Sequence, residues 1–293
     1  MPGRDRTRDA DDAPEGERPQ PAASTVAVHD SIVCVRVTTL GDLILDVIVR
    51  LDAPLVVGDD SVAETRAGPG GQAANVAAWA ATLGAESRFV GKRGDDAAGV
   101  VVTRELASRG VGVSGPAGGR NGVVVSIAAG GDRTMASDRG AASELRPEEL
   151  DAAWFECDVL HVSGYSLARE PIASAARRAV ALARGAGARV SVDVSAWTLV
   201  DERFRSRVRA LEPDIVFANE RERDAVGEVE ADWVVKRGAA GVVVGGESFP
   251  SLATEVVDTT GAGDALAAGY LVGGIERGLE AAARCCAQLG AMP

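Results

Sequence analysis

One short stretch of the chain carries residues whose types and spacing suit phosphoryl transfer. Residues 258–265 read Asp-Thr-Thr-Gly-Ala-Gly-Asp-Ala and lead into an alanine-rich, helix-like run. Gly261 and Gly263 leave the backbone amides around Ala262 uncovered, and amides at a helix start attract an anion. Asp264 beside such an anion hole can take a proton from an attacking hydroxyl. The alternative is that Asp264 caps an ordinary helix after a glycine turn.

A second glycine-rich stretch precedes another small-residue helix. Residues 68–75 read Gly-Pro-Gly-Gly-Gln-Ala-Ala-Asn, and the helix-like run that follows stops at Gly84. Taken alone, the first six residues fit a dinucleotide fingerprint and an NAD-dependent enzyme. That fingerprint directly follows the first long strand, whereas the charged residues 59–66 intervene here. We therefore rank the NAD interpretation below phosphoryl transfer, and a titration with NADH tests it.

Together the two stretches resemble the two signatures of the ribokinase family, also called the PfkB family of sugar kinases. The resemblance extends over residues 31–293, with both signatures in the family's order. It implies an ATP-dependent kinase that needs Mg²⁺ and phosphorylates a small sugar or sugar acid. By this resemblance Asp264 is the general base, and the amides of Gly261, Ala262 and Gly263 form the anion hole. The sequence contains no GxxxxGK[ST] string, which excludes a P-loop enzyme.

The resemblance also assigns the substrate side of the site. Asp46 interrupts an apolar, strand-like run, where a carboxylate is costly to bury unless it faces a cleft or a partner. By the family's pattern Asp46 accepts hydrogen bonds from substrate hydroxyls. Gly70 and Gly71 pack close against the sugar, and Asn75 hydrogen-bonds it. The alternative for Asn75 is a cap in the first turn of the helix.

Two departures from the family's pattern indicate a substrate other than ribose. Ile44 stands where family ribokinases carry Asn, and Gln72 stands where a Lys is common. Arg139 lies in an Arg-Gly-Ala element similar to the family's and, if it faces the pocket, favours an acidic or phosphorylated sugar. Residues 43–67 and 112–139 contain no Phe, Tyr or Trp on which a base could stack. We therefore expect a sugar substrate, with a nucleoside kinase of the same family as the alternative.

The nucleotide side rests on two further motifs. Asn219 and Glu222 match the family's Asn-x-x-Glu, which implies that both organise Mg²⁺ and the phosphates, largely through water. The alternative is a helix cap followed by charged surface turns. Lys236, Gly238 and Gly241 form a Lys-x-Gly-x-x-Gly turn between two apolar runs, similar to the family's nucleotide contact. Lys236 would then meet an ATP phosphate as a point charge.

Cation sites follow only from the resemblance. Glu222 is expected to serve Mg²⁺, and Asp258 and Thr260 are expected to offer backbone oxygens to K⁺. The segment between Glu222 and Trp233 has room for only a turn or two of helix, and the sequence stops at the Gly-Ala-Met-Pro of residues 290–293, where family members usually run on. These two features motivate another alternative, a catalytically silent nucleotide-binding or scaffold member of the fold.

Composition narrows the class of protein. The chain has 293 residues, 46% of them hydrophobic, enough for one large α/β domain. A net charge of −12 without a basic stripe argues against nucleic acid as partner. No apolar run is long enough to cross a membrane, and no signal peptide is recognisable. The four cysteines form no metal-ligand spacing, so we expect a cytoplasmic protein.

The order of elements predicts the fold class. Residues 1–30 read as a disordered tail, and residues 31–293 as a single kinase domain. After residue 147, apolar strands alternate with helices, which predicts a mostly parallel sheet covered on both faces. The resemblance makes this a three-layer α/β/α ribokinase-like fold with a small β lid from about 43–67 and 119–139, and a homodimer could form through that lid. We also expect a strand at 255–257, a helix starting at Pro147, and a final helix from Leu279.

Overall fold

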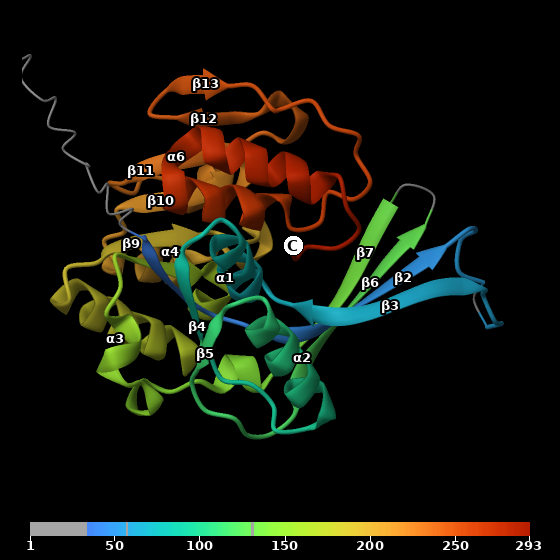
Figure 1. Cartoon of the computed structure of the whole chain (residues 1–293), viewed down its shortest axis with the longest axis horizontal. Coiled ribbons are helices and arrows are strands. Elements are labelled where there is room, and N and C mark those ends of the chain that lie inside the picture. Colours follow the sequence, from blue (N-terminus) through green and yellow to red (C-terminus); the bar gives the residue numbers. More distant parts are fainter. Residues whose placement is uncertain (1–33, 57, 130–131) are drawn as a thin grey trace, which may run out of the picture. The chain divides into compact units, whose positions relative to one another are not determined.

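The computed structural model describes residues 34–293 except 57 and 130–131, so the expected tail, residues 1–30, lies outside it. Its main sheet has nine strands. These strands are β1 (Arg36–Leu40), β4 (Glu86–Val90), β5 (Gly112–Ser114), β8 (Val159–Ser163), β9 (Arg189–Asp193), β10 (Ile215–Asn219), β11 (Asp232–Lys236), β12 (Val242–Val244) and β13 (Glu247–Phe249). Their order is β13-β12-β11-β10-β9-β8-β1-β4-β5, and only the pairs β11–β12 and β12–β13 are antiparallel (Figure 1).

Six α-helices accompany the sheets in the described residues. They are α1 (Gln72–Thr82), α2 (Ala97–Ser108), α3 (Ile172–Gly185), α4 (Glu202–Ala210), α5 (Glu220–Val226) and α6 (Ala262–Cys286). In Figure 1, α1 and α6 lie on the opposite side of the main sheet from α3. None of these helices is both long enough and apolar enough to span a membrane.

The central strands are buried on both faces, and the two faces contribute to different cores. On β8, Leu160 and Val162 pack with α3 and α4 in one apolar cluster. Their neighbour Val159 packs with α1 and α6 in another. Successive side chains of a strand point to opposite faces, so a continuous apolar run is what a sheet covered twice requires. The expected three-layer α/β fold with a mostly parallel sheet is confirmed.

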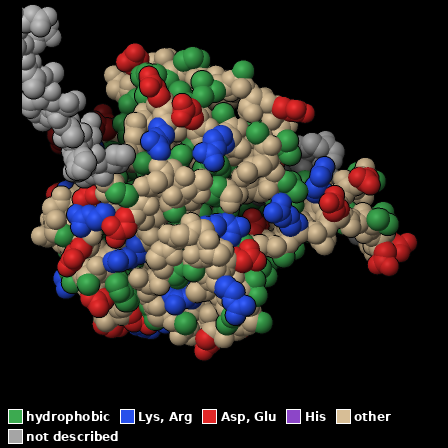
Figure 2. All heavy atoms as spheres, in the orientation of Figure 1, with side chains coloured by type: hydrophobic (Ala, Val, Ile, Leu, Met, Phe, Trp, Pro, Cys, Tyr) green, Lys and Arg blue, Asp and Glu red, His purple; other side chains and the backbone are tan. Residues whose placement is uncertain are grey.

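A separate four-stranded sheet forms from the segments for which a β lid was expected. Its strands are β2 (Ile44–Leu51), β3 (Ala63–Gly70), β6 (Asn121–Ala129) and β7 (Asp132–Gly140), in the order β3-β2-β6-β7. β2 pairs antiparallel with β3, which sets Asp46 opposite Gly68 and Ile44 opposite Gly70. This sheet projects from the side of the main domain (Figure 1). On the face drawn in Figure 2, positive and negative side chains are intermixed.

Three expectations about elements are wrong. Residues 255–257 form no strand: Val256 and Val257 are 61% and 57% exposed, and apolar sequence alone does not make a strand without a neighbouring strand to pair with. Pro147 begins only a short 3₁₀ helix, Pro147–Glu149. The final helix begins before Leu279, directly after the non-helical Gly273 and Gly274 that interrupt α6, and it ends at Cys286.

Candidate active site

A cavity of about 250 Å³ lies where the end of β1, the start of α1, the start of α6 and the four-stranded sheet meet. Strand ends and helix starts gather backbone and side-chain polar groups at one edge of a parallel sheet, where ligands bind. Sequence analysis named several of the lining residues. Those residues are Ile44, Asp46, Gly71, Gln72, Asn75, Arg139, Thr260, Gly261 and Asp264.

The start of α6 has the geometry of an anion site. Gly261 is the N-cap residue with φ of 78°, and a Cβ there would lie 2.5 Å from the Cβ of Ala291. Because the helix begins at Ala262, the amides of Gly263 and Asp264 belong to its first turn and have no partner within the helix. Asp264 is therefore not the capping residue, and its side chain is available to the cavity.

Asp264 is held by Asn75 across 189 residues of sequence. The Asn75 side-chain amide donates to Oδ2 of Asp264 at 2.7 Å. Burial raises the pKa of Asp264 to about 7, although the Asn75 hydrogen bond acts in the opposite direction. A carboxylate that titrates near neutral pH is matched to general-base work. Asn75 Oδ1 is buried without a hydrogen-bond partner among the described residues, so it can accept from a ligand.

The glycine pair before α1 lets two backbones approach. Gly71 has φ of 105°, and a Cβ on it would lie 2.4 Å from the carbonyl oxygen of Asp42. A Cβ on Gly70 would lie 2.7 Å from the Cβ of Asp46. A side chain at Gly71 would push the start of α1 away from the loop after β1, and one at Gly70 would push the end of β3 away from β2. These glycines thus bring Asp46 and the start of α1 to the same cavity.

Arg139 reaches the cavity, as expected, but two of its partners were missed by sequence analysis. Its guanidinium pairs with the buried carboxylate of Asp42 and lies 3.5 Å from the ring centroid of Tyr165. Asp42 follows the end of β1 directly, a position that could have identified it as a site residue. Tyr165 lies in a 3₁₀ turn after β8, and nothing in its sequence surroundings marked it.

Gln72, which replaces the common Lys, forms a network of its own. Its Oε1 accepts from Ser163 Oγ at 2.6 Å and from Ser195 Oγ at 2.5 Å. Ser195 lines the cavity with φ of 73°, an uncommon backbone conformation for a residue other than glycine. Sequence analysis did not identify Ser195, because its approach to Gln72 depends on how β8 and β9 lie side by side.

Lys236 stands at the end of β11, next to the start of α6. Its Nζ donates to Oδ2 of Asp193 at 2.7 Å, and it lies 3.4 Å from where a Cβ of Gly263 would be. Burial opposes the charged form, but Asp193, Glu222 and Asp264 together raise the pKa of Lys236. The ammonium therefore stays charged beside the anion site. Gly238 and Gly241 form the turn after it, both with positive φ.

Asn219 and Glu222 hold each other in a capping box at the start of α5. Asn219 Oδ1 accepts from the Glu222 amide at 2.9 Å, and Glu222 Oε2 accepts from the Asn219 amide at 2.8 Å. Glu222 is 5% exposed, and burial raises its pKa. The geometry is the helix cap that sequence analysis gave as the alternative. Their part in binding Mg²⁺ stays a prediction.

The loop before α6 is tied from both sides. Asp258 Oδ1 accepts from the amide and the hydroxyl of Thr260 at 2.9 and 2.6 Å, and its Oδ2 accepts from the Gly290 amide at 3.1 Å. The carbonyl of Thr260 accepts from Cys285 Sγ at 3.2 Å. In the part of the chain that the structure describes, no group of three or more His, Cys, Asp or Glu side chains could hold a metal ion.

Comparison with known proteins agrees with this geometry. The model of the pfkB carbohydrate kinase family matches residues 36–292. An ATP-dependent ribose-1-phosphate kinase from Halopiger xanaduensis is 34% identical, covering 86% of this chain and 90% of that protein. Fructokinase-1 from Oryza sativa is 33% identical over 80% of this chain and 81% of its own. Adenosine kinase from Sinorhizobium meliloti superposes with a TM-score of 0.76 at 28% identity, covering 88% of this chain and 96% of its own.

Proposed function

Because the chain belongs to the pfkB family of carbohydrate kinases, we propose that it transfers the γ-phosphoryl group of ATP to a hydroxyl of a small sugar or sugar acid. Asp264 takes the hydroxyl proton as the oxygen–phosphorus bond forms and the bond to ADP breaks. The observation that carries this proposal is Asp264 itself. It has a pKa of about 7, lines the cavity, and lies one residue after the orphan amide of Gly263.

Charge on the moving phosphoryl group is stabilised by the start of α6 and by Lys236. The amides of Gly261, Ala262 and Gly263 lie at the positive end of the helix dipole, that of Ala262 also donating to the Thr259 carbonyl at 3.3 Å, and the ammonium lies beside Gly263. Gly238 and Gly241 shape the turn that follows Lys236 and would border the nucleotide. Such fixed donors need no reorganisation during the reaction, which is why they suit phosphoryl transfer.

The substrate lies between the four-stranded sheet and α6. Asp46 and Asn75 offer oxygens to sugar hydroxyls, and Gly70 and Gly71 leave room for the ring. Arg139 closes this end of the cavity with Asp42. Relatives named ribose-1-phosphate kinase and fructokinase support a sugar acceptor.

Mg²⁺ would be held mostly by the phosphates and water, since Mg²⁺ keeps much of its hydration and needs few direct carboxylates. Glu222 and Asp193 are the nearby carboxylates, and Glu222 retains its place in the capping box with Asn219. Bound Mg²⁺ neutralises charge on the transferred group. Asp258 and Thr260 remain the candidate ligands for K⁺, through their backbone oxygens.

The test is ADP release from MgATP, with K⁺ present, across sugars, sugar acids, sugar phosphates and nucleosides. With a substrate found, Asp264→Asn should lower kcat by about 10²–10⁴-fold and leave ATP affinity nearly unchanged. The kcat/KM of the unaltered enzyme should rise with pH through about 7, because the base must be deprotonated. Near-normal turnover by Asp264→Asn would remove Asp264 as the base.

A nucleoside acceptor is the second candidate, favoured by the 28% identical adenosine kinase and by Tyr165 at the cavity. One face of the Tyr165 ring is already covered by the guanidinium of Arg139, which leaves that face closed to a base. This contact favours a sugar. Rapid phosphorylation of adenosine with every sugar inert would reverse the preference.

A further inference from the structure

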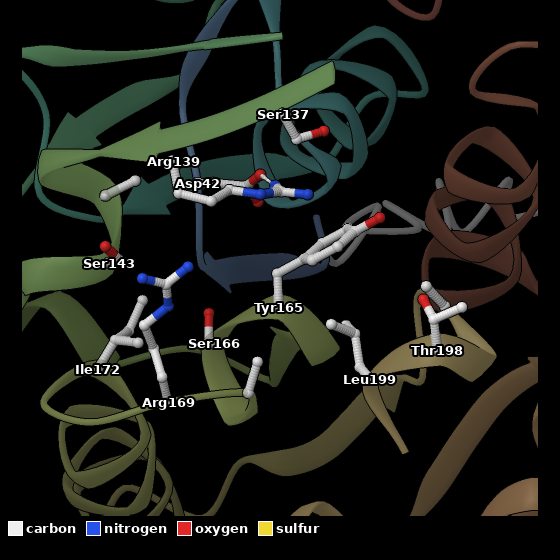
Figure 3. A pocket seen from close by; sticks show the side chains of 13 residues that line it. Asp42, Ser137, Arg139, Ser143, Tyr165, Ser166, Arg169, Ile172, Thr198 and Leu199 are labelled. Atoms are coloured by element: carbon white, nitrogen blue, oxygen red, sulfur yellow. Dashed lines mark hydrogen bonds and ion pairs between the residues drawn. The ribbon is translucent and has the colours of Figure 1, made fainter. Parts of the chain in front are cut away.

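A second pocket, of about 300 Å³, adjoins the candidate active site. Asp42, Arg139 and Tyr165 line both pockets, so the two meet at these side chains. The second pocket continues away from them toward the 3₁₀ turn after β8 and the start of α3, where Ser166 and Arg169 lie. Figure 3 shows the guanidinium of Arg169 and the hydroxyl of Ser166 pointing into the space below the Arg139–Asp42 pair.

The side chains that line this pocket carry a net positive charge, whereas the whole chain is net negative. The whole chain carries a net charge of −12, yet the pocket is lined by Arg139 and Arg169 against the single carboxylate of Asp42. Arg139 already pairs with that carboxylate. Arg169 has no ion pair or side-chain hydrogen bond with any other described residue; its charge also acts on Asp138, which is outside the pocket lining and already pairs with Arg120. The lining itself therefore carries one positive charge more than its carboxylate balances, which favours an anion.

Ser166 gives an independent sign of a missing ligand. Its side chain is 1% exposed, and its Oγ has no hydrogen-bond partner among the residues that the structure describes. Burying a hydroxyl without a partner costs free energy, so such a group calls for an explanation. A ligand oxygen in the pocket would accept from this hydroxyl. Asp42 Oδ1 is likewise buried without a hydrogen-bond partner there and can accept from a substrate hydroxyl at the junction of the pockets.

We propose that the second pocket binds a phosphate group of the substrate through Arg139, Arg169 and Ser166, so that the acceptor is a sugar phosphate. This inference rests on the kinase activity proposed above. The sugar lies in the first pocket with its reacting hydroxyl at Asp264, and its phosphate lies beyond Tyr165. The bound phosphate takes no part in the chemistry, and no bond to it forms or breaks.

The donor set favours a phosphate over a carboxylate. A single guanidinium satisfies a carboxylate through two parallel hydrogen bonds. A phosphate monoester presents three oxygens and a charge of about −1.5 to −2 at pH 7. Two guanidinium groups and a hydroxyl supply enough donors and charge for that group. The sugar acid, the other anionic acceptor, is therefore an outcome for the experiment to distinguish.

The experiment compares matched acceptors in the ADP-release assay. Ribose is paired with ribose 1-phosphate and ribose 5-phosphate, fructose with its 1- and 6-phosphates, and gluconate represents the sugar acids. We expect one phosphate ester to exceed its neutral parent in kcat/KM by at least 10-fold. Turnover of a neutral sugar equal to or above that of its phosphates would overturn the inference and leave the proposed kinase activity standing, as would a preference for gluconate.

Arg169→Gln tests the pocket directly. Loss of a charged hydrogen bond should raise KM for the phosphate ester about 10- to 100-fold with little change in kcat. KM for a neutral sugar should not change. Arg178→Gln removes an exposed positive charge from α3, the helix that follows Arg169, at a position outside the pocket, and serves as the matched control. Equal effects of the two variants would mean that only the general field of the protein changed, which contradicts the proposal.

Binding without ATP separates this inference from the kinase proposal. Calorimetry with ribose 5-phosphate and the other esters should detect binding that weakens with added salt and is lost in Arg169→Gln. Ser166→Ala should weaken it about 3- to 30-fold without lowering the Tm of the free protein, because the hydroxyl removed has no partner in that state. A lowered Tm would show that Ser166 is structural. No ester binding, together with turnover of a neutral sugar, would refute the subsite alone.

Discussion

Burial of Asp264 suits it to accept a proton near neutral pH but makes its charged form unfavourable. The carboxyl group lies in a cavity that raises its pKa to about 7, from an ordinary value of 3.8. The same desolvation makes the proton transfer favourable and the charged form costly. Asn75 offsets part of this cost by donating to the carboxylate, and its own oxygen stays unpartnered. We therefore expect a bound substrate hydroxyl to donate to this oxygen.

A stability measurement can show this conflict. When folding raises the pKa of an acid, the protein loses stability as the pH rises from about 4 through about 7. The reason is that the unfolded state releases the proton at a lower pH than the folded state does. Asp264→Asn should therefore raise the free energy of unfolding by about 1–3 kcal/mol at pH 8. At pH 4 the variant and the parent should unfold alike. Denaturant unfolding at both pH values checks this, and a gain of equal size at pH 4 would contradict it.

Asn75→Ala probes the same pair from the other side. Without the donated hydrogen bond, the pKa of Asp264 should rise further. The acid limb of the kcat/KM profile should then shift to higher pH, and KM for the substrate should increase as the free amide oxygen is lost. A pH profile measured over 5.5–9.5 would show it. An unshifted limb would mean that Asn75 serves only substrate binding.

At the scale of elements, the start of α6 brings the proposed base, the proposed anion hole and Lys236 together. Gly261 turns the chain with φ of 78°, and both Gly261 and Asp264 in the first turn of the helix line the cavity. Lys236 is the last residue of β11, and the end of β11 lies beside the end of β10 in the parallel part of the sheet. Neither element makes the site alone. A helix start attracts an anion, and the ion pair with Asp193 holds the ammonium of Lys236 in place beside it.

Two glycines in this turn should respond differently to alanine. Gly261→Ala forces a left-handed conformation and a clash with Ala291, so we expect destabilisation by about 1–3 kcal/mol. Gly263→Ala meets only the flexible end of Lys236 and should leave the Tm within a few degrees. It should nevertheless raise KM for ATP several-fold, because the methyl group enters the anion site. Thermal melts and ATP titrations of both variants separate these effects.

At the scale of the whole molecule, the site depends on contacts between distant parts of the chain. The indole of Trp79, 1% exposed on α1, donates to the carbonyl of Ala291 at 2.8 Å. Ala291 in turn packs against Gly261. Residues 212 apart in sequence therefore fix the turn on which the anion hole is built. Ala291 also lines the cavity, so we expect the segment after α6 to influence the site.

Trp79→Phe should break that link. We expect a loss of about 1–2 kcal/mol in the free energy of unfolding, since a buried carbonyl loses its donor, and a raised KM for ATP. Trp233→Phe is the matched control, because its indole donates to the carbonyl of Val229 at 3.1 Å, at a pocket formed by other residues. The control should lose some stability without any change in KM. Equal KM values in both variants would contradict the link.

The sequence alone determined the fold class, because the alternation of apolar strands and helices has few packed solutions, and it predicted the base, because Asp264 stands in a long local motif. It did not determine the partners that act through space. Whether Asn75 meets Asp264, and whether Tyr165, Ser195 and Asp42 reach the cavity, were decided only by tertiary structure. These contacts join strand ends and helix starts that are far apart along the chain. The local sequence does not show which of them become neighbours.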